Sequence, residues 1–173
     1  ANHLKDSLER DHDITVDWDG SKYVRISLKW DYDARTLDTS VPGFVKKSLI
    51  KYQHPMPSKP QHAPAKSAPI NYGAKVQQKT PEDNSAPLSE AGIKRIQDVV
   101  GTFSWYSRAT DPTMAQTLSS IAGRQAKATK QLKDEVHQFL DYCATHPDAI
   151  VRYHASEMIL ALHSDVSHLS EPL

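Results

Sequence analysis

Prolines are concentrated in one part of this chain. Seven of the eleven prolines fall between Pro55 and Pro87 of the 173-residue sequence. Because proline has no backbone N–H and a fixed φ, neither a helix nor an interior strand can continue through such a stretch. We therefore expect an extended connector over residues 55–88, with an ordered region on each side. A polyproline segment can also act as a docking ligand, but the irregular proline spacing favours a connector.

The residues before the connector alternate between apolar and polar side chains, as β-strands do. Residues 14–18 and 23–30 are predicted strands on either side of Asp19-Gly20, a dipeptide typical of hairpin turns. A third, shorter strand is expected over residues 35–39. The alternation places Trp30 on the apolar side of its strand, so we expect its side chain in a core.

Apolar residues recur with the spacing of a helix at both ends of this strand region and again after the connector. Short helices are predicted over residues 3–10 and 44–52, the second one basic and amphipathic. Ser89 and the Asp111-Pro112 pair are suited to begin two further helices, and a third begins near Thr129. Three helices with short joints predict a small bundle.

In the last residues, apolar and polar side chains alternate again. This predicts a terminal β-hairpin formed by residues 150–154 and 158–163. The expected fold class is therefore α+β. Its parts are a small antiparallel sheet, a Pro-rich tether, a three-helix bundle and the terminal hairpin.

The formal net charge of zero conceals an uneven distribution. Residues 1–38 carry nine acidic and six basic side chains, whereas residues 39–81 carry seven lysines and no acid. Residues 82–173 carry twelve acids and eight bases. The acid-free block could contact a polyanion, or it could be a solvated linker that happens to be rich in lysine.

Several classes of protein and of site are disfavoured by the sequence. No apolar run approaches the roughly 20 residues that a membrane helix needs. Cys143 is the one cysteine, which favours a reducing, intracellular setting and, on the apolar stripe of its helix, a place in the core. The nine histidines show no spacing typical of a metal site. The aspartates near the strands are expected to form turns; they are Asp17, Asp19, Asp31 and Asp33.

Six short segments carry a resemblance to a known family. In order, they are LKDSL at 4–8, ISL at 26–28, KPQHAP at 59–64, VGTFSWY at 100–106, RATDP at 108–112 and LHSDVS at 162–167. In this order and spacing, over nearly the whole chain, the sequence resembles the polymerase region of copia-type LTR retrotransposons. That region encodes a reverse transcriptase followed by a ribonuclease H.

The resemblance implies a division of the chain into parts of a larger enzyme. They would be the end of the polymerase palm with a primer-grip-like hairpin (1–41), a basic helix at the start of the thumb (42–54), the Pro/Lys-rich connector (55–88), a helical thumb and connection (89–147), and the start of a ribonuclease H-like domain (148–173). The parent protein would be an intracellular RNA-directed DNA polymerase, cytoplasmic or within virus-like particles and the nucleus.

The resemblance also implies site residues and partners. Lys46, Lys47 and Lys51 would contact a template–primer duplex of RNA and DNA, and the rest of the retrotransposon polyprotein would be a second partner. Asp165 would be the first carboxylate of the ribonuclease H site, which binds Mg²⁺ in the parent enzyme. Nucleotidyl transfer by this family needs a pair of adjacent aspartates that hold two metal ions. No two aspartates are adjacent in this sequence, so the chain alone is expected to be inactive and to need no cofactor. The alternative is a non-enzymatic adaptor whose helical bundle binds a protein partner.

Overall fold

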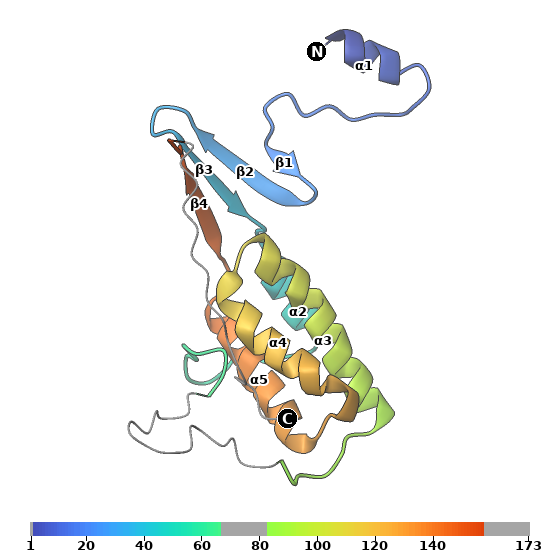
Figure 1. Ribbon diagram of the computed structural model, residues 1–173, viewed down its shortest axis with the longest axis vertical. Helices are drawn as coiled ribbons and strands as arrows, with labels where there is room; N and C mark the ends of the chain where they lie inside the picture. Colours follow the sequence, from blue (N-terminus) through green and yellow to red (C-terminus); the bar gives the residue numbers. More distant parts are fainter. Residues whose placement is uncertain (1, 67–82, 158–173) are drawn as a thin grey trace.

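The computed structural model describes residues 2–66 and 83–157, and it consists of a β-sheet joined to a helical bundle. The sheet lies at one end of the bundle, and the N-terminal helix projects away from both (Figure 1). The expected α+β class is confirmed, since four antiparallel strands and five α-helices are present in the described residues.

The sheet has the strand order β1-β2-β3-β4, and every neighbouring pair is antiparallel. Its strands are β1 (Lys22–Tyr23), β2 (Ile26–Asp31), β3 (Thr36–Ser40) and β4 (Ile150–His154). The predicted strand over residues 14–18 does not form. The partner expected for β4 at 158–163 lies outside the described residues, and β4 pairs instead with β3, more than a hundred residues earlier.

A bidentate ion pair joins β3 to β4. Arg152 lies directly opposite Asp38 in the register, and its Nε and Nη2 atoms each donate to one carboxylate oxygen at 2.7 Å. Hydrogen bonding to this guanidinium lowers the pKa of the Asp38 carboxyl. The bidentate geometry makes the pairing specific, and it adds a side-chain contact to the five-residue backbone register of the two strands.

The β1–β2 turn lies inside the predicted strand over residues 23–30, which is therefore interrupted. Tyr23 pairs with Ile26, so Val24 and Arg25 alone make the turn, with φ values of 46° and 70°. Two positive φ values match the right-handed twist of a hairpin, but they normally require Asn-Gly. A β-branched valine in this region is strained. The pattern predicted the turn at Asp19-Gly20 because local sequence preference favours that dipeptide.

One face of the sheet is apolar and open to solvent. Trp30, Leu37 and Tyr153 lie opposite one another on adjacent strands, so they share this face. Trp30 is 45% exposed and Tyr153 is 54% exposed. The alternation over residues 26–30 was therefore predicted correctly, but the expected burial of Trp30 is wrong because no described helix or strand covers it. The Trp30 indole instead donates to the carbonyl oxygen of Gly20 at 2.9 Å and stacks on Tyr32.

Three helical segments after the connector begin at residues whose side chains cap a free N–H group. The side chains of Ser89, Asp111 and Thr129 accept hydrogen bonds from the amides of Gly92, Thr113 and Leu132. These helix starts agree with the predictions from sequence. The helices are α1 (Asn2–Leu8), α2 (Phe44–Lys51), α3 (Glu90–Ala109), α4 (Ala115–Arg124) and α5 (Lys130–Thr145), with 3₁₀ turns at Pro112–Met114 and Gln125–Lys127.

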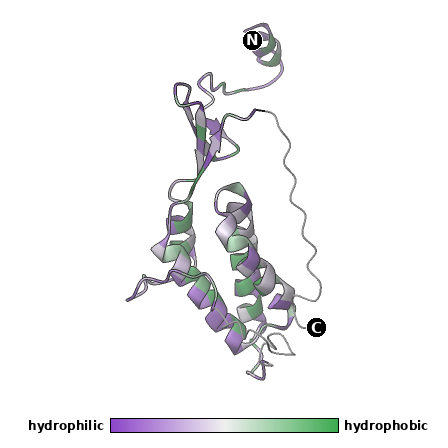
Figure 2. Cartoon of the chain, turned by 60° about the vertical axis from the view of Figure 1, so that its left-hand side comes forward, coloured by the Kyte–Doolittle hydropathy of each residue, from purple (hydrophilic) through white to green (hydrophobic). Residues whose placement is uncertain are grey.

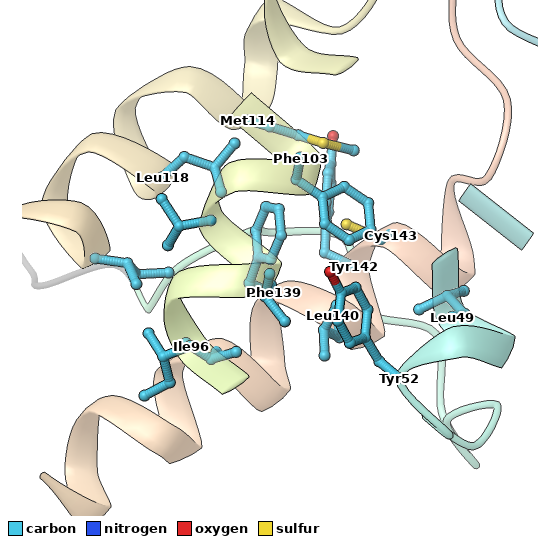
Figure 3. Packing of buried hydrophobic residues seen from close by; sticks show 14 of the residues in the cluster. Leu49, Tyr52, Ile96, Phe103, Met114, Leu118, Phe139, Leu140, Tyr142 and Cys143 are labelled. Atoms are coloured by element: carbon cyan, nitrogen blue, oxygen red, sulfur yellow. The ribbon is translucent and has the colours of Figure 1, made fainter. Parts of the chain in front are cut away.

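The core of the bundle contains four helices rather than the three predicted. Phe103 of α3 and Phe139 of α5 meet edge to face at its centre, with ring centroids 5.3 Å apart (Figure 3). Cys143 is fully buried there, as expected. The basic helix α2 adds Val45, Leu49 and Tyr52 to the same cluster. Hydrophobic residues accordingly gather along the helices in Figure 2.

The described parts of the connector lie against the bundle. The amide of Gln61 donates to the Thr145 hydroxyl at 2.9 Å, so the segment after α2 lies beside α5. On the other side of the undescribed stretch, Leu88 and Ala128 are joined by a backbone hydrogen bond of 2.9 Å. The described proline-rich residues therefore form no helix and no strand beyond an isolated β-bridge between Pro87 and Thr129, but they are not a free tether.

Replacement of Phe103 by alanine tests the packing of this core. Its side chain has no exposed surface, so the change should remove about 3–5 kcal/mol from the free energy of unfolding, measured by chemical denaturation. Gln97→Ala, on the exposed side of the same helix, is the control and should change stability by less than about 0.5 kcal/mol. A similar loss in both variants would contradict the packing described.

A second prediction concerns the strained turn. The double change Val24→Asn with Arg25→Gly should raise the free energy of unfolding by about 1–3 kcal/mol, because these residues adopt positive φ values with little strain. Arg25→Lys retains the strain and should leave stability unchanged. A double variant less stable than the original chain would show that the Val-Arg side chains stabilise the hairpin by more than the strain costs.

Candidate nucleic-acid interface

The helix α2 carries the three lysines predicted to bind nucleic acid, and its other side is firmly seated in the bundle. The Tyr52 hydroxyl donates to the Asp98 carbonyl oxygen at 2.8 Å and lies 2.6 Å from the Thr102 hydroxyl. Arg95 of α3 donates to the carbonyl oxygen of Tyr52 at 2.5 Å. These contacts fix which side of α2 faces solvent.

All three lysines lie on the solvent side of α2. Lys46, Lys47 and Lys51 are exposed, whereas Val45, Ser48 and Leu49 on the other side of the helix are buried. Lys47 and Lys51 are one helical turn apart and therefore neighbours on the surface. The structure thus brings the predicted residues together on one face.

No acidic side chain among the described residues pairs with the charge of Lys46 or Lys47. The sequence around them is acid-free from 39 to 81. Lys51 is partly engaged, because its ammonium lies 3.5 Å from the Tyr52 hydroxyl and 5.0 Å from the ring centroid. Lys46 and Lys47 are therefore the two cations of this face whose charge is directed to solvent.

A cavity of about 460 Å³ lies between the strained β1–β2 turn and the helices α2 and α3. Its lining includes Arg25 of the turn, Phe44 at the start of α2, and Trp105 of α3. The rings of Phe44 and Trp105 are 5.3 Å apart, and Trp105 is 38% exposed. No local sequence pattern indicates this cavity, because its walls come from three separate segments.

The chain leaves α2 through a tight turn that positions a histidine. The amides of Gln53 and His54 donate to the carbonyl oxygens of Ile50 and Leu49, each at 3.0 Å. This is the Schellman pattern, which usually has glycine in the left-handed position that Gln53 occupies with φ 52°. The turn brings His54 onto α5.

On α5, His54 meets a second histidine and an aspartate. His54 Nε2 is 2.7 Å from Asp141 Oδ1, and His137 Nδ1 is 3.3 Å from Asp141 Oδ2. Burial lowers the pKa of His54, and the hydrogen bond to Asp141 opposes that shift. Among the residues that the structure describes, this is the one group of three or more His, Cys, Asp or Glu side chains close enough to hold a metal ion.

Sequence spacing could not reveal this group of side chains. His54 and Asp141 are 87 positions apart, a separation that spacing rules do not cover. The sequence did indicate one part of the group, because His137 and Asp141 are four residues apart on a predicted helix and must share a face.

The remaining predicted acidic residues are Asp165 and the aspartates near the strands. Asp165 lies outside the described residues, so the expected Mg²⁺ site stays a prediction. Asp17 accepts from the backbone amide of Lys22 and the hydroxyl of Ser21, and the first of these bonds contributes most to lowering its pKa. Asp31 accepts from the amide of Ala34. Both are turn residues, as expected.

Comparison with known proteins identifies no relative: no family model, no curated protein and no solved structure matches this chain. Among the helices of the described residues, none is both long and apolar enough to cross a membrane.

Proposed function

We propose that this chain is a piece of a retrotransposon reverse transcriptase and that α2 holds the sugar–phosphate backbone of a template–primer duplex. The observation that carries the proposal is the exposed, uncompensated pair Lys46 and Lys47 on a helix fixed by its buried side. A seated helix presents its charges at constant spacing, so it loses little freedom when phosphates bind.

The surroundings of α2 are consistent with the same role. Trp105 and Phe44 offer aromatic surface beside the lysine face, and Arg25 adds a cation at the cavity. Aromatic and basic side chains side by side are typical of surfaces that bind nucleic acid, because they match both the bases and the phosphates. The α2 lysines would supply the larger share of the affinity, through release of counterions.

The open apolar face of the sheet supports the second part of the proposal. Trp30, Leu37 and Tyr153 form a continuous strip that another segment of a larger protein would cover. In the proposed parent this would be the rest of the polymerase palm. The Mg²⁺-dependent chemistry would belong to that parent, with Asp165 as one carboxylate of its ribonuclease H site. The proposed location is inside the cell, where the RNA template is found.

A protein-docking adaptor is the second candidate. The observation in its favour is Ile50, which is 77% exposed in the middle of the lysine face. An exposed aliphatic side chain suits a protein partner better than a phosphate backbone. Binding to a duplex therefore separates the two candidates.

The test is a salt titration of binding to an RNA–DNA hybrid duplex. Changing Lys46, Lys47 and Lys51 together to alanine should reduce the magnitude of the slope of log K against log salt by about 2–3, one unit for each lost phosphate contact. Affinity should not depend on duplex sequence, because phosphate contacts carry no sequence information. Circular dichroism of the variant checks that the fold is retained.

The matched control removes three other exposed lysines, Lys127, Lys130 and Lys133, near the start of α5. It changes the net charge by the same amount, so it should leave the slope nearly unchanged if contacts are confined to α2. Equal slopes for both variants would mean that the charge acts only through the overall field. Weak duplex binding by the original chain, with no change in slope, would favour the adaptor.

A further inference from the structure

We propose that His54, His137 and Asp141 form a zinc site that fastens the segment after α2 to α5. The site is independent of the proposed nucleic-acid role, and it lies at a junction of elements distant in the sequence. His54 comes from the turn that ends α2, and the other two residues lie one helical turn apart on α5.

The donor atoms lie close together but must converge further to hold a zinc ion. Tetrahedral Zn²⁺ with bonds near 2.0 Å needs donor atoms about 3.3 Å apart. The His137 and Asp141 atoms are 3.3 Å apart, and the His54 and Asp141 atoms are 2.7 Å apart. All donor atoms of the group lie within 4.8 Å of one another. The two contacts end on different oxygens of Asp141, so an ion bound to one oxygen requires the wider separations to close toward 3.3 Å, which rotation of the exposed His137 side chain would achieve.

The ligands are held by structure already present. The His54 side chain is only 3% exposed, and its backbone is fixed by the Schellman turn. The Asp141 side chain is partly buried on α5, and His137 precedes it by one turn on the same helix. His137 is 59% exposed, so it can rotate to close on an ion without repacking the core.

The donor set selects the class of metal. Two imidazole nitrogens and one carboxylate suit zinc, whereas Mg²⁺ and Ca²⁺ prefer oxygen ligands alone. Three protein ligands leave a fourth position, which a water molecule would occupy on the exposed His137 side. The consequence for the fold is a cross-link between the connector and α5, in addition to the hydrogen bond between Gln61 and Thr145.

The experiment titrates the full chain with Co²⁺, whose visible absorption reports four-coordinate binding, and then displaces it with Zn²⁺. One equivalent should bind. His137→Gln removes an exposed ligand without disturbing the core and should weaken binding by more than about 100-fold, beyond the usual effect of losing only a supporting residue. Zinc at 100 times its Kd should raise the folding equilibrium constant of the original chain about 100-fold, and should not do so in the variant.

The matched control is His62→Gln. His62 also bridges the connector and α5, through a 3.2 Å contact with His146, but it lies outside the proposed site. This variant should keep one tight equivalent and the cobalt spectrum. Equal weakening in both variants would overturn the proposal, because it would show diffuse binding by many histidines. Unchanged binding in His137→Gln would overturn it as well.

Discussion

The seating of α2 in the helical bundle is the contact on which the other arrangements depend. Val45, Leu49 and Tyr52 bury one side of a short helix whose other side is charged. A helix of eight residues has little stability of its own, so burial of these side chains and the Tyr52 hydrogen bonds must maintain it. With that side fixed, the orientation of the lysines follows from the helical repeat alone.

The same contact determines where the neighbouring segments lie. The residues before α2 form β3, so seating the helix also places the sheet at one end of the bundle (Figure 1). The residues after it turn through Gln53 onto α5, which brings His54 to Asp141. One packed helix thus connects the lysine face, the open sheet and the histidine cluster. Loss of its apolar contacts would disturb all three.

Two polar surfaces of different character result from this arrangement. The lysine face has cations without carboxylate partners among the described residues, which suits a polyanion that brings its own charge. The histidine cluster has a carboxylate already shared by two imidazoles, which suits a compact cation. The two surfaces share no residue, since the lysines belong to α2 and the histidine cluster to the turn after it and to α5.

Periodicity and capping residues in the sequence determined the helices after the connector, the alternation over residues 26–30 and the amphipathic character of α2, because these depend on neighbours within a few positions. Tertiary structure decided what long-range contacts control. Trp30 remained exposed because nothing described covers its face, and the turn moved to Val24-Arg25 because pairing set the register. The partnership of His54 with Asp141 exists only after α2 and α5 pack, so no local pattern could contain it.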